Sequence, residues 1–116
     1  MDDCVFCGIV KKTVPATIVF DNDEVMAFKD NNPVAPIHFL IIPKRHYPSF
    51  EAVSDPIIMN QLLTVAKELG AKHSADLGYR VLINSAQQAE VDHAHVHLLG
   101  GLRPEAVLSP QGGDDT

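Results

Sequence analysis

The segment at residues 92–99 (DHAHVHLL) constrains this chain more than any other, because histidine alternates along it with alanine, valine and leucine. Successive side chains of a β-strand point to opposite faces, so the alternation predicts a strand over residues 93–99. His93, His95 and His97 then share one face, roughly 7 Å apart at about 3.3 Å per residue. The residues between them turn toward a core.

Three interpretations of this histidine face are possible. An exposed, chemically idle face would explain a single histidine better than three in strict alternation. A metal site is a second interpretation, but neighbours roughly 7 Å apart cannot converge on one ion held at about 2.1 Å without ligands from another segment. Imidazole is also the natural side chain for acid–base and nucleophilic chemistry near neutral pH. We favour this third interpretation.

The rest of the pattern predicts a single α+β domain over residues 1–108, followed by a mobile tail at 109–116 that is rich in glycine and acid. The unbroken apolar run at 39–42 is typical of a central strand covered on both faces. The expected elements are a short helical turn at 4–11, strands at 17–20, 24–28, 39–42, 79–84 and 93–99, and one main helix from Pro56 into the mid-seventies.

The main helix has a clear start signal. Asp55 can cap the first turn, and Pro56 occupies a position where its missing N–H is harmless. Gly70 could end the helix early, because glycine inside a helix costs about 1 kcal/mol relative to alanine. The apolar residues that recur at helical spacing are Ile58, Leu62, Val65 and Leu69.

Composition excludes several classes of function. The net charge of −6 and the pI of about 5.3 argue against binding DNA or RNA as a polymer, which calls for a basic stripe. There is no apolar run of about 18 residues, so we expect no membrane span. The chain begins with acidic residues instead of a basic secretory signal, and we therefore expect a cytoplasmic protein.

The two cysteines, Cys4 and Cys7, are too few and too close for a secreted disulfide framework. As a C-x-x-C pair they could be a redox motif, although such motifs usually follow a strand and open a long helix. They could also supply two ligands of a zinc site that needs two more. A third interpretation is a pair of buried thiols packed as small hydrophobes.

The segment at 93–99 resembles the signature of the histidine triad family, His-φ-His-φ-His-φ-φ with φ apolar, at every position. Other features are similar to the branch of nucleoside phosphoramidate hydrolases, and the resemblance extends over residues 4–103. These features are Gly100-Gly101, the segment 38–46 (HFLIIPKRH), and Asp30 with Pro33 and Pro36.

The resemblance implies a reaction and a fold. The fold is an antiparallel sheet of about five strands, with one main helix and a short N-terminal helix, joined to a second sheet across a homodimer. His95 would attack the α-phosphorus of a purine nucleoside 5′-monophosphoramidate and form a nucleotidyl-histidine, which water then cleaves. His97 and His38 would contact the phosphate oxygens. The carbonyl group of His93 would keep the far nitrogen of His95 protonated.

The resemblance also implies how the nucleotide binds. Asp30 would accept hydrogen bonds from the ribose hydroxyls, and Asn84 would position the phosphate or His95. The base would lie against Phe6, Ile9 and Phe28, and the chemistry would need no metal. The expected nucleotide-binding residues are Asp30, Asn31, Asn84, Ala89, Glu90, His95 and His97.

Family members with the N-terminal cysteine pair complete a tetrahedral zinc site with two histidines. The matching positions here are His46 and His93, so the resemblance implies that Cys4, Cys7, His46 and His93 bind a structural zinc. Such a site has no open coordination position.

The chain departs from the family just before the triad. Members with phosphoramidase activity usually carry Gly-Gln-Ser-Val there, whereas this chain reads Gln-Ala-Glu-Val at 88–91, with Glu90 in place of the serine. Two further functions are therefore considered: a dinucleoside polyphosphate hydrolase, against which Gly100-Gly101 speaks mildly, and a nucleotide- and zinc-binding regulatory protein with little turnover. His73 belongs to no motif, and we expect it at the surface.

Overall fold

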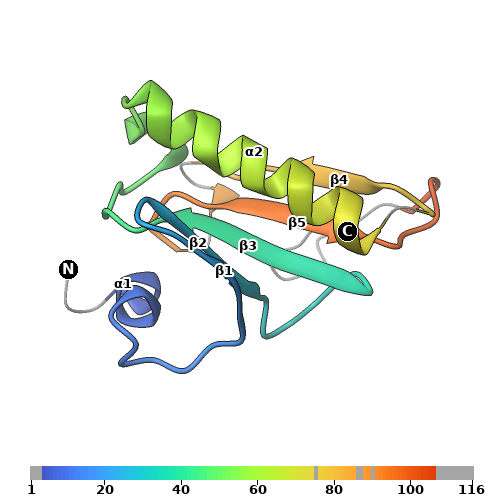
Figure 1. Ribbon diagram of the computed structural model, residues 1–116, viewed down its shortest axis with the longest axis horizontal. Coiled ribbons are helices and arrows are strands. Elements are labelled where there is room, and N and C mark those ends of the chain that lie inside the picture. Colours follow the sequence, from blue (N-terminus) through green and yellow to red (C-terminus); the bar gives the residue numbers. More distant parts are fainter. Residues whose placement is uncertain (1–3, 75, 86–87, 90, 107–116) are drawn as a thin grey trace.

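The computed structural model describes residues 4–74, 76–85, 88–89 and 91–106. It contains one antiparallel sheet in the order β1-β2-β3-β5-β4, with α2 on one face and α1 beside the other (Figure 1). The predicted α+β fold is confirmed. The elements are α1 (Val5–Val10), β1 (Ile18–Asp21), β2 (Val25–Lys29), β3 (Ile37–Pro43), a 3-10 turn (Phe50–Ala52), α2 (Pro56–His73), β4 (Tyr79–Leu82) and β5 (Val96–Gly100).

Strand β3 lies at the centre and is covered on both faces, as its continuous apolar run predicts. Phe39 and Ile41 pack into the cluster beneath α2. Leu40 and Ile42 pack on the opposite face, in the cluster that includes Phe6 of α1. The alternation along one strand thus separates a structural core under α2 from a second apolar layer under α1.

Helix α2 begins as predicted and passes through Gly70. The side chain of Asp55 accepts a hydrogen bond from the backbone N–H of Ile57 (2.9 Å), which caps the first turn. Gly70 lies against a side chain of β4, because a Cβ built on it would come within 2.6 Å of the Tyr79 ring. Close packing against the sheet therefore keeps the glycine inside a helix that ends only at His73, which is exposed as expected.

The predicted extent of the last strand is wrong at its start, because β5 begins at Val96 instead of His93. The backbone bends at residues 91–93, where the N–H of His93 donates to the carbonyl of Val91 (2.9 Å). The N–H of Ala94 donates to Tyr47, outside the sheet (2.7 Å). These bonds divert the chain from the ladder, so among the three histidines only His97 belongs to the strand. Strand β4 also ends earlier than predicted, at Leu82.

Two predictions concern residues outside those that the structure describes, namely the mobile tail at 109–116 and the placement of Glu90. Of the helices in the described part of the chain, none combines the length and the apolar character needed to cross a bilayer.

Candidate functional site

A cavity of about 640 Å³ opens between α1, the end of β2, the loop that follows β2, and the start of β5. This volume is in the range of small-molecule sites. Its apolar wall includes Phe6, Ile9 and Phe28, the three side chains expected to face a base. Its polar side is formed mainly by Lys29, Asp30, Asn31, Asn32, His95 and His97.

His95 is buried at this cavity, with its protonation pattern set by the backbone. Its Nδ1 lies 2.7 Å from the carbonyl oxygen of His93. A carbonyl only accepts hydrogen bonds, so Nδ1 of His95 carries a proton and donates it to that oxygen. The edge of the Phe6 ring packs against the imidazole at a centroid distance of 5.3 Å. These two contacts fix the orientation of the His95 ring at the cavity.

His97 and His38 form a buried pair beside His95. His38 Nε2 lies 3.0 Å from His97 Nδ1 and 3.3 Å from Oδ2 of Asp30. Burial, reinforced by the charges of His95 and His38, lowers the pKa of His97 to about 3. Burial also lowers the pKa of His38, against the opposing charge of Asp30. Both imidazoles are therefore neutral near pH 7.

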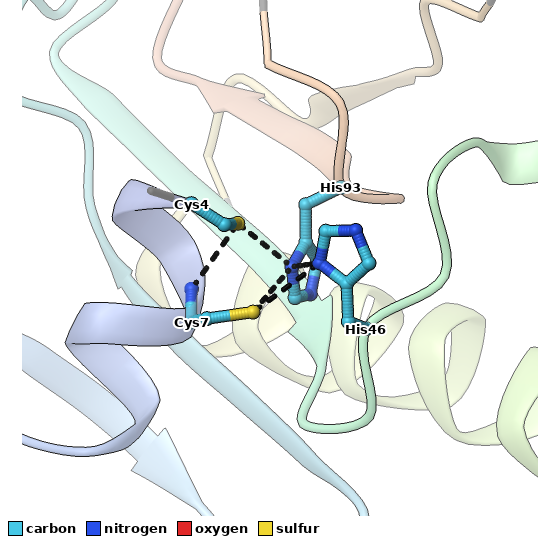
Figure 2. A group of neighbouring side chains, drawn as sticks. All are labelled: Cys4, Cys7, His46 and His93. Atoms are coloured by element: carbon cyan, nitrogen blue, oxygen red, sulfur yellow. Dashed lines mark hydrogen bonds between the residues drawn. The ribbon is translucent and has the colours of Figure 1, made fainter. Parts of the chain in front are cut away.

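The structure brings Cys4, Cys7, His46 and His93 together at one end of the sheet, with their potential ligand atoms all within 4.8 Å of one another (Figure 2). His93 Nδ1 lies 3.4 Å from Cys4 Sγ and 3.7 Å from Cys7 Sγ. His46 Nδ1 lies 3.2 Å from Cys7 Sγ and 3.2 Å from His93 Nδ1. Segments separated by up to 89 positions in the sequence thus converge on one point.

This cluster has the geometry of a tetrahedral metal site. With zinc bonds of about 2.1 Å to nitrogen and about 2.3 Å to sulfur, tetrahedral ligands lie about 3.4–3.8 Å apart, close to the four distances given above. His93 Nε2 lies 2.9 Å from the carbonyl oxygen of Pro43 and donates its proton there. Its Nδ1 lone pair therefore faces the sulfurs and the other imidazole. The four residues therefore fit a cation, because their potential ligand atoms converge on one point. The Pro43 carbonyl orients one of these ligands, His93.

Some of the other residues predicted to bind the nucleotide line the cavity, and some do not. Asn31 lines the cavity with Asp30, whereas Asn84 and Ala89 are half-buried and are not among its described lining residues. Sequence reasoning missed Lys29 and Val34, which also line it. The position of Lys29 just before Asp30 is a signal that could have been used, but Val34 offers none.

Comparisons with known proteins agree with this architecture. A family profile described as "HIT domain" matches residues 11–103. "Protein HitA" of Neisseria gonorrhoeae is 38% identical over 105 residues, which is 86% of this chain and 97% of that protein. The "14 kDa zinc-binding protein" of Brassica juncea is 39% identical over 105 residues, 85% of this chain and 93% of that protein.

The solved structures include similar folds. The "HIT family hydrolase from Clostridium thermocellum" has a TM-score of 0.84 and 37% identity, covering 92% of this chain and 97% of that one. The similarity thus extends over the whole fold and is not confined to the histidine segment.

Proposed function

The chain belongs to the HIT domain family, and on that premise we propose that it is a nucleotide hydrolase that cleaves purine nucleoside 5′-monophosphoramidates through a nucleotidyl-histidine at His95. Similar proteins of known structure are named HIT family hydrolases, which supports the hydrolase class. The phosphoramidate substrate is our own inference from the cavity and from the resemblance to the phosphoramidase branch.

The observation that carries the proposal is the position of His95. Its Nδ1 proton points to the His93 carbonyl, and the ring lies at a cavity whose lining includes an apolar wall and the carboxylate of Asp30. Such a cavity suits a nucleotide, since an aromatic wall takes the base and a carboxylate takes sugar hydroxyls. An imidazole with its lone pair held in place can then attack a phosphorus atom.

The reaction has two displacements. In the first, the lone pair of His95 Nε2 forms a bond to the α-phosphorus, and the P–N bond breaks as its electron pair takes up a proton from solvent water to give the free amine. In the second, water adds its hydroxyl to phosphorus, the P–Nε2 bond breaks, and the lone pair returns to His95. Water supplies both the hydroxyl that ends on phosphorus and the proton that ends on the amine.

We assign the other predicted residues to binding and charge stabilisation. His97 contacts the phosphate oxygens, where negative charge develops in the transition state. His38 has both ring nitrogens engaged within the protein, so it supports His97 in place of the phosphate contact expected for it. Asp30 and Asn31 hold the ribose. We also propose that Asn84, Ala89 and Glu90 take part in binding the nucleotide, and that the glutamate in place of the usual serine alters which leaving group is accepted.

The test compares two substrates, adenosine 5′-phosphoramidate and diadenosine tetraphosphate. We expect the wild-type protein to release AMP from the first, and His95→Ala to lose at least about 10³-fold in kcat. His73→Ala is the matched control, because His73 is exposed at the end of α2, away from the cavity. Alkaline quenching and intact-protein mass spectrometry should detect AMP bound to the wild-type protein and none on His95→Ala.

The same experiment separates the other two functions. Preferred cleavage of diadenosine tetraphosphate would identify a dinucleoside polyphosphate hydrolase. Tight AMP binding without turnover of either substrate would identify a regulatory nucleotide-binding protein. Either result would contradict the phosphoramidase proposal.

We also propose that Cys4, Cys7, His46 and His93 hold a structural zinc. The support is the tetrahedral spacing of their ligand atoms, together with a similar protein named for zinc binding. Two thiolates and two imidazoles fill all four positions, so bound zinc would stabilise the fold without reacting. Reduced thiols agree with the cytoplasmic location that we propose. Metal analysis of the purified protein should give one zinc per chain, and a metal-free but folded protein would contradict the assignment.

A homodimer is proposed as well, with the two sheets joined. Strand β4 is an edge of the sheet, and its Tyr79 and Val81 are exposed by 38% and 42%. An edge with exposed apolar side chains is a template for pairing with another chain. Size-exclusion chromatography with light scattering should give twice the chain mass at micromolar concentration, and a monomer mass would contradict the proposal.

A further inference from the structure

A chain of hydrogen bonds leads into the histidine pair from the loop between β2 and β3. The backbone N–H of Val34 donates to His38 Nδ1 (3.2 Å). On the other side of the same ring, His38 Nε2 lies 3.0 Å from His97 Nδ1 and 3.3 Å from Asp30 Oδ2. The loop is held over His38 by the N–H of Asp30, which donates to the His38 carbonyl (3.0 Å).

The direction of the first bond determines the proton positions on both rings. An amide N–H only donates, so His38 Nδ1 must carry a lone pair. A neutral imidazole has one donor and one acceptor nitrogen, and the ring proton of His38 is therefore on Nε2. When that proton is donated to His97 Nδ1, the proton of His97 is placed on Nε2.

The neutral state that this argument requires is supported by burial. His38 and His97 are 3% and 2% exposed. The loss of hydration lowers the pKa of each ring, that of His97 to about 3. Near pH 7 each ring thus holds a single proton, and its position is decided by hydrogen bonds.

Asp30 competes with His97 for the same proton. Its carboxylate lies only 0.3 Å farther from His38 Nε2 than His97 Nδ1 does, from the two distances of 3.3 and 3.0 Å. Hydroxyl groups that donate to this carboxylate would weaken it as an acceptor for His38. The carboxylate is also within the lining of the cavity, with its side chain 17% exposed, so a sugar can reach it.

Asp30, His38 and His97 are spaced like metal ligands, but the position of the proton on His38 opposes metal binding. Asp30, His38 and His97 have potential ligand atoms within 4.8 Å of one another. A metal at this point would have to bind His38 Nε2, which carries the proton as long as Val34 donates to Nδ1. The group is therefore better described as a hydrogen-bond chain.

We propose that Val34, through its backbone amide, and Asp30, through its carboxylate, are positioning residues that set the proton of His97 by way of His38. A sugar bound to Asp30 commits the His38 proton to His97 Nδ1, which fixes His97 in the form that carries its own proton on Nε2. This inference rests on the proposed nucleotide function, and it makes the ribose hydroxyls a requirement for a fully active site.

The experiment reads the tautomers directly, by nitrogen-15 NMR of the full-length protein labelled at histidine. In the ligand-free wild type, His38 and His97 should each have the proton on Nε2. The coupling between His38 Nε2 and His97 Nδ1 across the shared proton should strengthen with AMP and not with 2′,3′-dideoxy-AMP. If the coupling between His38 Nε2 and His97 Nδ1 is the same with AMP and with 2′,3′-dideoxy-AMP, the proposed role of Asp30 is overturned.

Two variants isolate the two positioning residues. Val34→Pro removes the N–H, whereas the matched control Val34→Ala keeps it and should keep both tautomers. We expect Val34→Pro to shift His38 toward the Nδ1-protonated form and to lower kcat about tenfold relative to Val34→Ala, the effect of losing one ordinary hydrogen bond. In Asp30→Ala, AMP and dideoxy-AMP should give the same coupling.

Unchanged tautomers in a folded Val34→Pro protein would overturn the role of Val34. If that variant does not fold, the Asp30→Ala comparison still decides whether the sugar acts through this carboxylate. Failure of AMP to bind the wild type would overturn the proposed function and the role of the sugar together. The ligand-free spectra test the Val34 assignment separately from the function.

Discussion

Three backbone groups orient the histidines of the triad, each in a different way. The Pro43 carbonyl takes the proton of His93 and leaves Nδ1 for the cysteine cluster. The His93 carbonyl accepts the Nδ1 proton of His95 and so fixes the orientation of that ring. His97 receives a hydrogen bond from a ring that is itself oriented by an amide. Identical side chains thus differ in role because each tautomer is fixed by its neighbour.

Burial of His97 should make stability depend on pH. Its folded pKa of about 3 lies below the usual value of 6.5, so below pH 6.5 the unfolded chain binds more protons than the folded one. Stability is therefore lost as the pH falls from 6.5 toward 3, by about 1.4 kcal/mol per unit for this residue alone. Urea unfolding at pH 7, 5.5 and 4.5 should show this loss.

The controls for the pH dependence are two substitutions. His97→Gln removes the titrating ring and should reduce the slope of the unfolding free energy against pH. His73→Gln makes the same substitution at an exposed histidine and serves as the comparison for His97→Gln. A slope that is equal in His97→Gln and wild type would contradict the prediction.

At the scale of secondary structure, the sequence predicts the types of element well and their ends less well. The Asp55 cap and the apolar run of β3 depend on local chemistry, and both are found where they were expected. The start of β5 depends on a contact with Tyr47, a residue far away in sequence, so alternation alone placed it three residues too early. Val34 acts through its backbone N–H, which every residue except proline has, so no sequence pattern could reveal it.

Gly70 gives a prediction that sets helix propensity against packing. Alanine is favoured over glycine in a helix by about 1 kcal/mol. The added Cβ would nevertheless come within 2.6 Å of the Tyr79 ring, and such overpacking costs about 1–3 kcal/mol. We expect Gly70→Ala to lower the free energy of unfolding in the wild type and to raise it by about 1 kcal/mol in a Tyr79→Ala background. The four proteins of this double-mutant cycle can be measured by urea unfolding, and stabilisation in both backgrounds would contradict the packing argument.

At the scale of the whole molecule, α1 connects the two sites. Its first turn carries Cys7 and is capped by Cys4, while Phe6 and Ile9 line the cavity. Phe6 also packs edge-on against His93 and His95, at centroid distances of 5.7 and 5.3 Å. A helix of six residues is too short to be stable alone, so its position depends on these contacts.

Removal of the metal should therefore weaken nucleotide binding as well as stability. Without a cation, α1 is held to the sheet by its apolar contacts and by thiol–imidazole contacts, which are weaker than metal bonds, and the wall of the cavity loosens. We expect a chelator to weaken AMP binding at least about tenfold by calorimetry, the change that 1.4 kcal/mol produces. Trypsin should also cleave faster after Lys11 and Lys12, at the end of α1.

The matched variant is Cys7→Ala, which should bind AMP as weakly as the chelated wild type and should not respond to the chelator. Zinc added back should restore AMP affinity and protease resistance in the wild type only. If the chelated wild type loses its zinc and keeps its AMP affinity, then α1 holds the cavity wall without the metal. The four-residue cluster would in that case contribute to stability alone, since the apolar packing of Phe6 and Ile9 would suffice to shape the site.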